Sequence, residues 1–357
     1  MMNSRQHGHC DAGDDVLYSA EIARKSAIVP GVSPRSPTRR RLLQAAALAA
    51  CLPLAACTPP PEIGGSFVQL WLSHLEWTRK QWRERLVTTH ALGCKEIFVQ
   101  WVGIDGEPDK TWMAPDSLIR TLLDESAALG MGVHLGLPYD ERWWTAIGTT
   151  DEAPLDAYLQ RTGQRVARYM QKAAWPRHRA FRGWYFPYEL EQYDWALPAR
   201  QDKLAAWLGS MSAVAVATSG QTPTISTYYS RLPTTGTLAG LWRTLLDRVA
   251  LHPMIQDGVG VAGLSNYDSL APLHDMLRSR GAPFDLVIEL FEELPSEKND
   301  GTDFNAKAAT FSRVKRQWEI ARNYGATRLV AFAIDPWALD DTPESKALLR
   351  EWRAALS

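Results

Sequence analysis

The sequence predicts an α/β protein, a single-domain (β/α)8 barrel preceded by an export signal. Eight short apolar runs alternate with eight amphipathic stretches over residues 66–357, which is the element order of this barrel. An open doubly wound sheet is the alternative, but no glycine-rich phosphate loop follows the first apolar run, which disfavours a nucleotide-binding fold. The residues before Cys57 have the composition of a secretion signal.

The leader comprises residues 1–57. The basic segment 38–41 is followed by a run of apolar and small residues up to Ala56, which is shorter than the ~20 residues of a membrane-spanning helix. The sequence Leu54-Ala55-Ala56-Cys57 resembles a lipobox, so we expect Cys57 to carry a lipid. The arginines before two leucines resemble a twin-arginine export signal; an ordinary secretory signal with an extra arginine is the alternative.

Residues 58–65 form a spacer that is stiffened by three consecutive prolines. The residue after the expected lipid anchor is Thr58, not the aspartate that typically retains a lipoprotein in the inner membrane. We therefore expect an exported, membrane-anchored lipoprotein on the periplasmic face, at the outer membrane.

The barrel is predicted to span residues 66–357, and its strands are the short runs rich in β-branched and aromatic residues. These runs are 66–73, 96–103, 132–138, 182–189, 223–229, 254–261, 284–291 and 327–334. Several of the helical stretches between them end at a glycine, the residue that most readily terminates a helix. The predicted helices are 78–92, 117–129, 156–174, 200–218, 238–251, 270–280, 306–324 and 342–356.

Composition excludes some classes of function. The formal net charge is −1, and residues 58–357 have no basic tract, which argues against nucleic-acid binding. Cys94 is the one cysteine after Cys57, so we expect no disulfide within the barrel and a buried, apolar Cys94. The 15 tryptophans all lie between Trp71 and Trp352; they favour stacking on sugar rings or, alternatively, filling of a large core.

Two carboxylates are the candidate catalytic residues, because active sites of this barrel form at the C-terminal ends of its strands. Glu189 ends an apolar strand, and Glu289 interrupts another. A buried carboxylate without a partner is costly and has a raised pKa, and two such groups at one site perform glycoside hydrolysis. The structural alternatives are a salt bridge from Glu189 to Arg182 or Arg142, and a stabilising pair between Glu289 and a neighbouring strand.

The same reading of strand ends provides candidate substrate-binding residues. Polar and aromatic side chains are typical of a glycan site, with Trp101 and Trp337 as possible platforms for sugar rings. Asp257 is alternatively the cap of an Asp-Gly turn. The candidates are Trp71, His74, Gln100, Trp101, Tyr188, Tyr228, Asp257 and Trp337. We expect no metal, no cofactor and no serine nucleophile, because the corresponding motifs are missing from the sequence.

Four segments strengthen this interpretation: residues 67–71, 99–101, 183–189 and 288–291. Through them, residues 66–355 resemble a bacterial lipoprotein family of unknown function within the glycoside-hydrolase-like (β/α)8 barrels. The resemblance implies that Glu189 is the acid/base and Glu289 the nucleophile of a retaining glycosidase. Many barrels of this group have an asparagine directly before the first glutamate, where this chain has Tyr188.

The sequence therefore predicts a lipid-anchored hydrolase that cleaves a poly- or oligosaccharide with two carboxylates. The first alternative is a non-catalytic glycan-binding lipoprotein on the same barrel, which the tyrosine at position 188 favours. The second is another barrel enzyme, such as a lyase or isomerase, because the fold does not determine the reaction. We expect a carbohydrate as the ligand, membrane contact through the lipid on Cys57, and no required protein partner.

Overall fold

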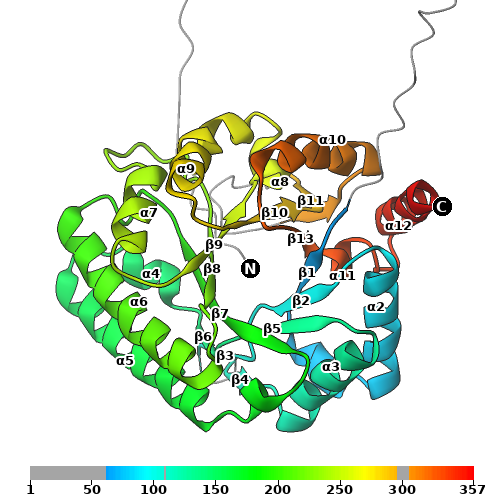
Figure 1. The fold of residues 1–357 in the computed structure, drawn as a ribbon, viewed down its shortest axis with the longest axis horizontal. Coiled ribbons are helices and arrows are strands. Elements are labelled where there is room, and N and C mark those ends of the chain that lie inside the picture. Colours follow the sequence, from blue (N-terminus) through cyan, green and yellow to red (C-terminus); the bar gives the residue numbers. More distant parts are fainter. Residues whose placement is uncertain (1–61, 108–109, 296–304) are drawn as a thin grey trace, which may run out of the picture. The chain divides into compact units, whose positions relative to one another are not determined.

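A computed structural model describes residues 62–107, 110–295 and 305–357, and in it eight parallel strands close into a barrel. Helices surround this ring of strands on the outside (Figure 1). The (β/α)8 fold predicted from the sequence is therefore confirmed. Around the barrel, the strands are β1 (Gly65–Val68), β2 (Glu96–Val99), β5 (Gly132–Gly136), β7 (Phe181–Leu190), β8 (Thr224–Thr227), β9 (His252–Gln256), β10 (Asp285–Glu289) and β13 (Arg328–Ala333).

The outer layer consists of amphipathic helices that bury their apolar side against the strands. Thr78 caps the first of them by accepting a hydrogen bond from the Gln81 backbone N–H, and Gly220 and Gly281 end two others in the left-handed conformation. These helices are α2 (Arg79–Ala91), α3 (Asp116–Ala128), α5 (Glu152–Lys172), α6 (Pro198–Ser219), α7 (Leu238–Leu246), α9 (Asn266–Arg280), α10 (Phe311–Ala321) and α12 (Pro343–Leu356).

Two predicted elements differ in the structure. The stretch 306–324 does not begin as a helix, because β12 (Ala306–Ala308) pairs with β11 (Phe291–Glu293) in an antiparallel hairpin. Helix α10 begins only after Thr310, whose side chain caps it. The predicted strand 254–261 ends at Gln256, and the short helix α8 (Val259–Ala262) follows. Both differences lie at the C-terminal side of the barrel strands.

A small three-stranded sheet extends the same side of the barrel. It consists of β3 (Gly103–Asp105), β4 (Trp112–Met113) and β6 (Tyr139–Asp140). The buried Asp140 carboxylate binds both Nε and Nη2 of Arg142, at 2.6 and 2.7 Å. Asp105 contacts the same guanidinium at 3.3 Å, so charge pairs fix this sheet.

The barrel interior is arranged in layers, because every second side chain of a strand points inward. On β10, this places Asp285, Val287 and Glu289 in one column. The middle of the interior is apolar and contains Phe67, Phe98, Tyr185, Met254, Val287, Phe291, Val330, Phe332 and Ala333. Tryptophans such as Trp184 and Trp242 instead fill the layer between strands and helices.

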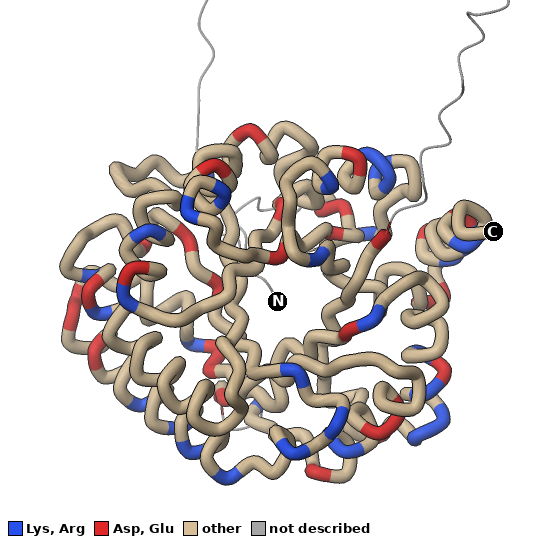
Figure 2. Tube along the Cα trace, viewed as in Figure 1, with Lys and Arg blue, Asp and Glu red and all other residues tan. Residues whose placement is uncertain are grey.

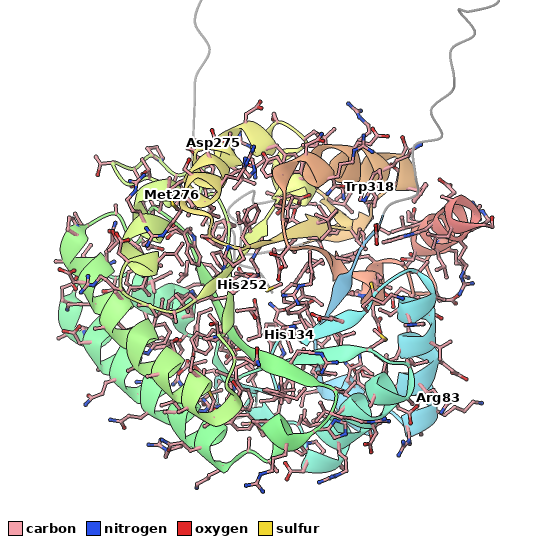
Figure 3. The ribbon with its side chains drawn as sticks, in the orientation of Figure 1. Arg83, His134, His252, Asp275, Met276 and Trp318 are labelled. Atoms are coloured by element: carbon pink, nitrogen blue, oxygen red, sulfur yellow. The ribbon has the colours of Figure 1, made fainter. Side chains whose placement is uncertain are left out.

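The N-terminal end of the interior is closed by a layer of charged residues. Arg328 binds Asp285 at 2.6 Å and also contacts Glu96, whose carboxylate accepts a hydrogen bond from His134 Nε2 at 2.8 Å. His252 lies 3.2 Å from Asp285. Figure 3 shows His134 and His252 within the ring of strands. These residues come from the start of β2, β9, β10 and β13 and from β5, so they join strands that are distant in sequence.

Charge pairing determines the ionisation of this layer. Burial raises the pKa of Asp285, but His252 and Arg328 outweigh it and leave the pKa below its usual value. Burial likewise raises the pKa of Glu96, but His134 and Arg328 together lower this pKa by more than burial raises it. Both carboxylates are therefore stabilised in their charged form in the folded protein.

Replacement of Arg328 by methionine should destabilise the fold by about 3 kcal/mol at pH 7, because it leaves the buried Asp285 and the partly buried Glu96 without their arginine. Urea unfolding would measure this change. The difference from the wild type should shrink below about pH 4, where carboxylates with lowered pKa values become protonated and lose their stabilising contribution. Arg350→Met, at an exposed position, is the control, and an equal loss in both variants would contradict a structural role for the charged layer.

Candidate functional site

The predicted carboxylates meet at the C-terminal end of the barrel. Glu189 is near the end of β7 and Glu289 ends β10. Both follow the inward positions of their strands, and only 8% and 4% of their surfaces are exposed. The charge of Glu189 contributes to the raised pKa of Glu289, so the two groups act on each other electrostatically.

Glu189 is held by a neutral donor. The amide Nε2 of Gln256, at the end of β9, donates to Glu189 Oε1 at 2.8 Å. Burial raises the pKa of Glu189 to about 7, although this hydrogen bond favours the charged form. The salt bridges considered from the sequence do not form: Arg142 pairs with Asp140, and Arg182 donates to main-chain carbonyls.

Glu289 is held by the main chain. The backbone N–H of Gly260, in α8, donates to Glu289 Oε2 at 2.7 Å. Burial, followed by the nearby charge of Asp257, raises the pKa of Glu289 to about 8. Arg313 from α10 donates to the carbonyl oxygens of Glu289 and Phe291, at 2.9 and 2.6 Å. Its positive charge lowers the pKa of Glu289 without reversing the shift.

Asp257 lies behind Glu289 and not at a surface. Its side chain is fully buried, and its carboxylate accepts hydrogen bonds from four donors, two of which are the backbone N–H groups of Val259 and Glu289. The expected direct contact between Asp257 and a ligand is therefore corrected to a contact with the protein itself. The turn-capping alternative matches the bond to Val259.

Tyr188 also lies away from the two carboxylates. It follows the outward positions of β7, and its ring packs on Trp143 and Trp207 at centroid distances of 5.0 and 4.9 Å. Because adjacent residues of a strand point to opposite faces, Tyr188 lies among the helices while Glu189 faces the interior. The sequence position next to Glu189 thus does not make Tyr188 a ligand contact, and this expectation is corrected.

Three predicted residues gather at the loop after β1. Trp71 is 37% exposed, whereas Trp101 is 5% exposed and donates its indole N–H to the Leu70 carbonyl at 2.7 Å. The two rings meet edge to face at 5.4 Å. His74 Nδ1 accepts the Trp71 backbone N–H at 3.0 Å, so His74 shapes this loop and Trp71 is its accessible ring.

The remaining predicted residues lie around the same end of the barrel. Gln100 is buried, and its amide oxygen has no hydrogen-bond partner within the described ranges. Tyr228 lies close enough to Glu191 and Glu189 for their charges to add to the effect of burial on its raised pKa. Trp337 packs against Phe291 at 5.5 Å. Tyr228 and Trp337 follow β8 and β13, which pair with the strands that carry the two glutamates, whereas Gln100 follows β2, which pairs with neither of them.

Three further residues belong to the site. Gln256 and Tyr139 stand at strand ends in the sequence, but only the structure shows Gln256 bound to Glu189 and Tyr139 stacked on Trp101 at 5.6 Å. Burial and then the charge of Glu189 raise the pKa of Tyr139. The amino-acid sequence did not point to Gly260, because this residue acts through its backbone N–H and not through a side chain.

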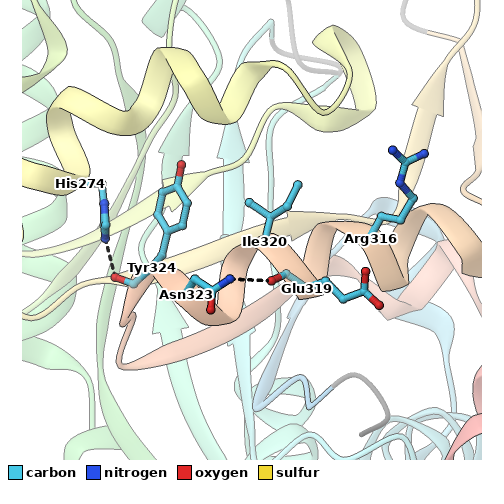
Figure 4. Close-up of a pocket in the computed structure, with 6 residues that line it drawn as sticks. All are labelled: His274, Arg316, Glu319, Ile320, Asn323 and Tyr324. Atoms are coloured by element: carbon cyan, nitrogen blue, oxygen red, sulfur yellow. Dashed lines mark hydrogen bonds between the residues drawn. The ribbon is translucent and has the colours of Figure 1, made fainter. Parts of the chain in front are cut away.

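Other parts of the described chain offer weaker sites. No group of three or more His, Cys, Asp or Glu residues that could hold a metal ion occurs among the described residues. An open pocket on the outside, between α9 and α10, is lined by residues that include His274, Arg316 and Tyr324 (Figure 4). Acidic and basic residues are interspersed over the outer helices in the view of Figure 2. None of the helices in the described ranges has the length and apolar character needed to span a bilayer.

Three of the solved structures to which this fold is similar are named as enzymes that act on carbohydrates. A Bacteroides thetaiotaomicron protein assigned as an alpha-L-fucosidase has a TM-score of 0.63 at 16% identity, over 84% of this chain and 94% of its own. The endo-alpha-mannosidase of family GH99 from Bacteroides thetaiotaomicron has a TM-score of 0.51 at 13% identity, covering 82% and 98%. A beta-galactosidase from Marinomonas ef1 has a TM-score of 0.53 at 12% identity, covering 82% of this chain and 58% of that enzyme.

These likenesses, at such low identity, show the fold alone, a (β/α)8 barrel. No curated protein sequence matches the chain. The model of one sequence family, described as a domain of unknown function, matches residues 63–347. The chain therefore belongs to the DUF4434 family.

Proposed function

We propose that this protein hydrolyses glycosidic bonds in a poly- or oligosaccharide. The observation that carries the proposal is the pair Glu189 and Glu289, two buried carboxyl groups. In the described part of the chain, neither side chain forms a hydrogen bond or an ion pair with an arginine. Glycoside hydrolysis uses such a pair, one group to protonate the leaving oxygen and one to act at the anomeric carbon. The glycosidase fold of the structural relatives supports a carbohydrate as substrate.

In the proposed retaining mechanism, Glu189 is the acid/base and Glu289 the nucleophile. Burial keeps the pKa of Glu189 near 7, a value suited to both giving and taking a proton near neutral pH. Because the pKa of Glu289 is about 8, much of it is protonated at neutral pH, and it must lose this proton before it can act as nucleophile. In the reactive form, an ionised oxygen of Glu289 attacks the anomeric carbon while protonated Glu189 gives its proton to the departing oxygen, and water later releases the sugar. Trp71, a partly exposed ring that follows β1 and contacts Trp101, would provide an apolar surface for a sugar at this end of the barrel.

The test is a comparison of the full chain with its Glu289→Gln variant on mannans, galactans and fucose-containing polysaccharides, the sugars of the structural relatives. The wild type should release reducing ends, and the variant should lose at least about 1,000-fold in kcat/KM while still binding the same glycan. Glu292→Gln, which removes an exposed carboxylate paired with Lys307, should leave the rate unchanged. Binding without cleavage by the wild type would instead support a glycan-binding protein.

We also propose that the protein is anchored by a lipid on Cys57 and faces the periplasm at the outer membrane. The support is the lipobox-like sequence Leu54-Ala55-Ala56-Cys57 and the threonine that follows it; these residues lie outside the described part of the structure. The Cys57→Ser variant should no longer incorporate labelled palmitate and should move from the membrane to the soluble fraction. Unchanged labelling in that variant would contradict the assignment of Cys57, and Cys51→Ser serves as the control.

A further inference from the structure

Both oxygens of the Asp257 carboxylate accept hydrogen bonds from the protein. Its Oδ1 accepts the backbone N–H groups of Val259 and Glu289, both at 3.2 Å. Its Oδ2 accepts the Tyr267 hydroxyl at 3.0 Å and the Gln317 amide at 2.7 Å. A carboxylate accepts at both oxygens, whereas a protonated carboxyl group would need one acceptor. The four donors therefore favour the charged form of Asp257, although they offset only part of the effect of burial, which raises its pKa.

The contacts of Asp257 fix the main chain of Glu289 itself. The N–H of Glu289 binds Asp257 directly, and Gln317 bridges Asp257 to the Glu289 carbonyl, to which its amide donates at 3.1 Å. Asp257 thus controls both the amide and the carbonyl of the residue whose side chain enters the site.

The same carboxylate also fixes the group that holds the Glu289 side chain. Through the Val259 N–H, Asp257 sets the start of α8, and this short turn presents the Gly260 N–H to Glu289 Oε2 at 2.7 Å. A Cβ atom on Gly260 would lie 2.6 Å from the Phe291 carbonyl oxygen and 2.8 Å from Glu289 Oε2. Only glycine allows the backbone to approach the carboxylate this closely.

We propose that Asp257 is a positioning residue, whose buried carboxylate fixes the backbone of Glu289 and the Gly260 N–H together and so orients the Glu289 carboxyl group. The role in catalysis rests on the proposed glycosidase function. The orientation itself does not, because it is a property of the free protein and can be measured without a substrate.

The charge of Asp257 adds a second effect. The charged groups that face Glu289 are Asp257, Arg313 from α10 and Glu189 from β7. Burial and then Asp257 raise the pKa of Glu289, and Arg313 offsets them only in part. When Glu289 bonds to the anomeric carbon, the bond to the departing oxygen breaks and Glu189 supplies its proton. Glu289 loses its charge in this step, which relieves the repulsion from Asp257 and favours the covalent intermediate.

The test is a titration of Glu289 in the full chain, followed by carbon-13 NMR of labelled glutamate carboxyl groups. Glu289→Gln identifies the signal by its loss. The Asp257→Asn variant removes the like charge, so the pKa of Glu289 should fall by about one pH unit. Asp268→Asn, an exposed carboxylate in α9, should leave the titration unchanged. An unchanged pKa of Glu289 in folded Asp257→Asn would overturn the proposal, whether or not the protein cleaves a glycan.

A second variant changes the hydrogen bond to the Glu289 side chain and leaves Asp257 in place. Gly260→Ala pushes the carboxylate away from the Gly260 N–H, a hydrogen bond that lowers the pKa of Glu289, so this pKa should rise. The two variants therefore shift the titration in opposite directions. If Asp257→Asn does not fold, Gly260→Ala provides the test. No shift, or a fall, in the pKa of Glu289 in that variant would contradict the proposal that Asp257 and the Gly260 N–H together orient the Glu289 carboxyl group.

Discussion

The structure depends on one geometric constraint, the alternation of side chains along a closed ring of parallel strands. On β10, this constraint places Asp285 in the charged layer, Val287 in the apolar middle and Glu289 in the candidate site. The apolar layer separates the two sets of charges and supplies the burial that raises the pKa of Glu289. The same strands thus carry residues that stabilise the fold near their N-terminal ends and residues of the candidate site at their C-terminal ends.

The two ends of the barrel interior differ in the pKa values of their carboxyl groups. Asp285 is buried beside Arg328, and its pKa falls below the usual range. Glu189 and Glu289 are buried beside an amide and a backbone N–H, and their pKa values rise. All three carboxyl groups are buried, so the paired cation of Asp285 makes the difference. A group that titrates near neutral pH can transfer protons there, whereas a permanently ionised one only stabilises.

The sequence was sufficient to predict the barrel, because its strand-like runs recur at regular intervals. It also singled out Glu189, which ends an apolar strand, and Glu289, which interrupts another, and both lie at the C-terminal end of the barrel. Their catalytic role stays a prediction. The sequence could not show that the Tyr188 side chain points away from the site, because the face to which a strand residue points depends on the register of that strand. It also could not reveal that Asp257 turns toward the main chain of Glu289, or that Gly260 holds a carboxylate by its N–H. These roles arise from contacts between segments that are distant in sequence, for which local patterns carry no signal.

The central claim, that Glu189 and Glu289 form the catalytic pair of a retaining glycosidase, is tested most directly by trapping the covalent intermediate. The full chain would be incubated with 2-deoxy-2-fluoroglycosyl fluorides of the manno, galacto, gluco and fuco configurations, and the modified peptide located by tandem mass spectrometry. The account predicts one added sugar, on Glu289. A sugar attached to another residue, or no attachment from any of the four reagents, would contradict it.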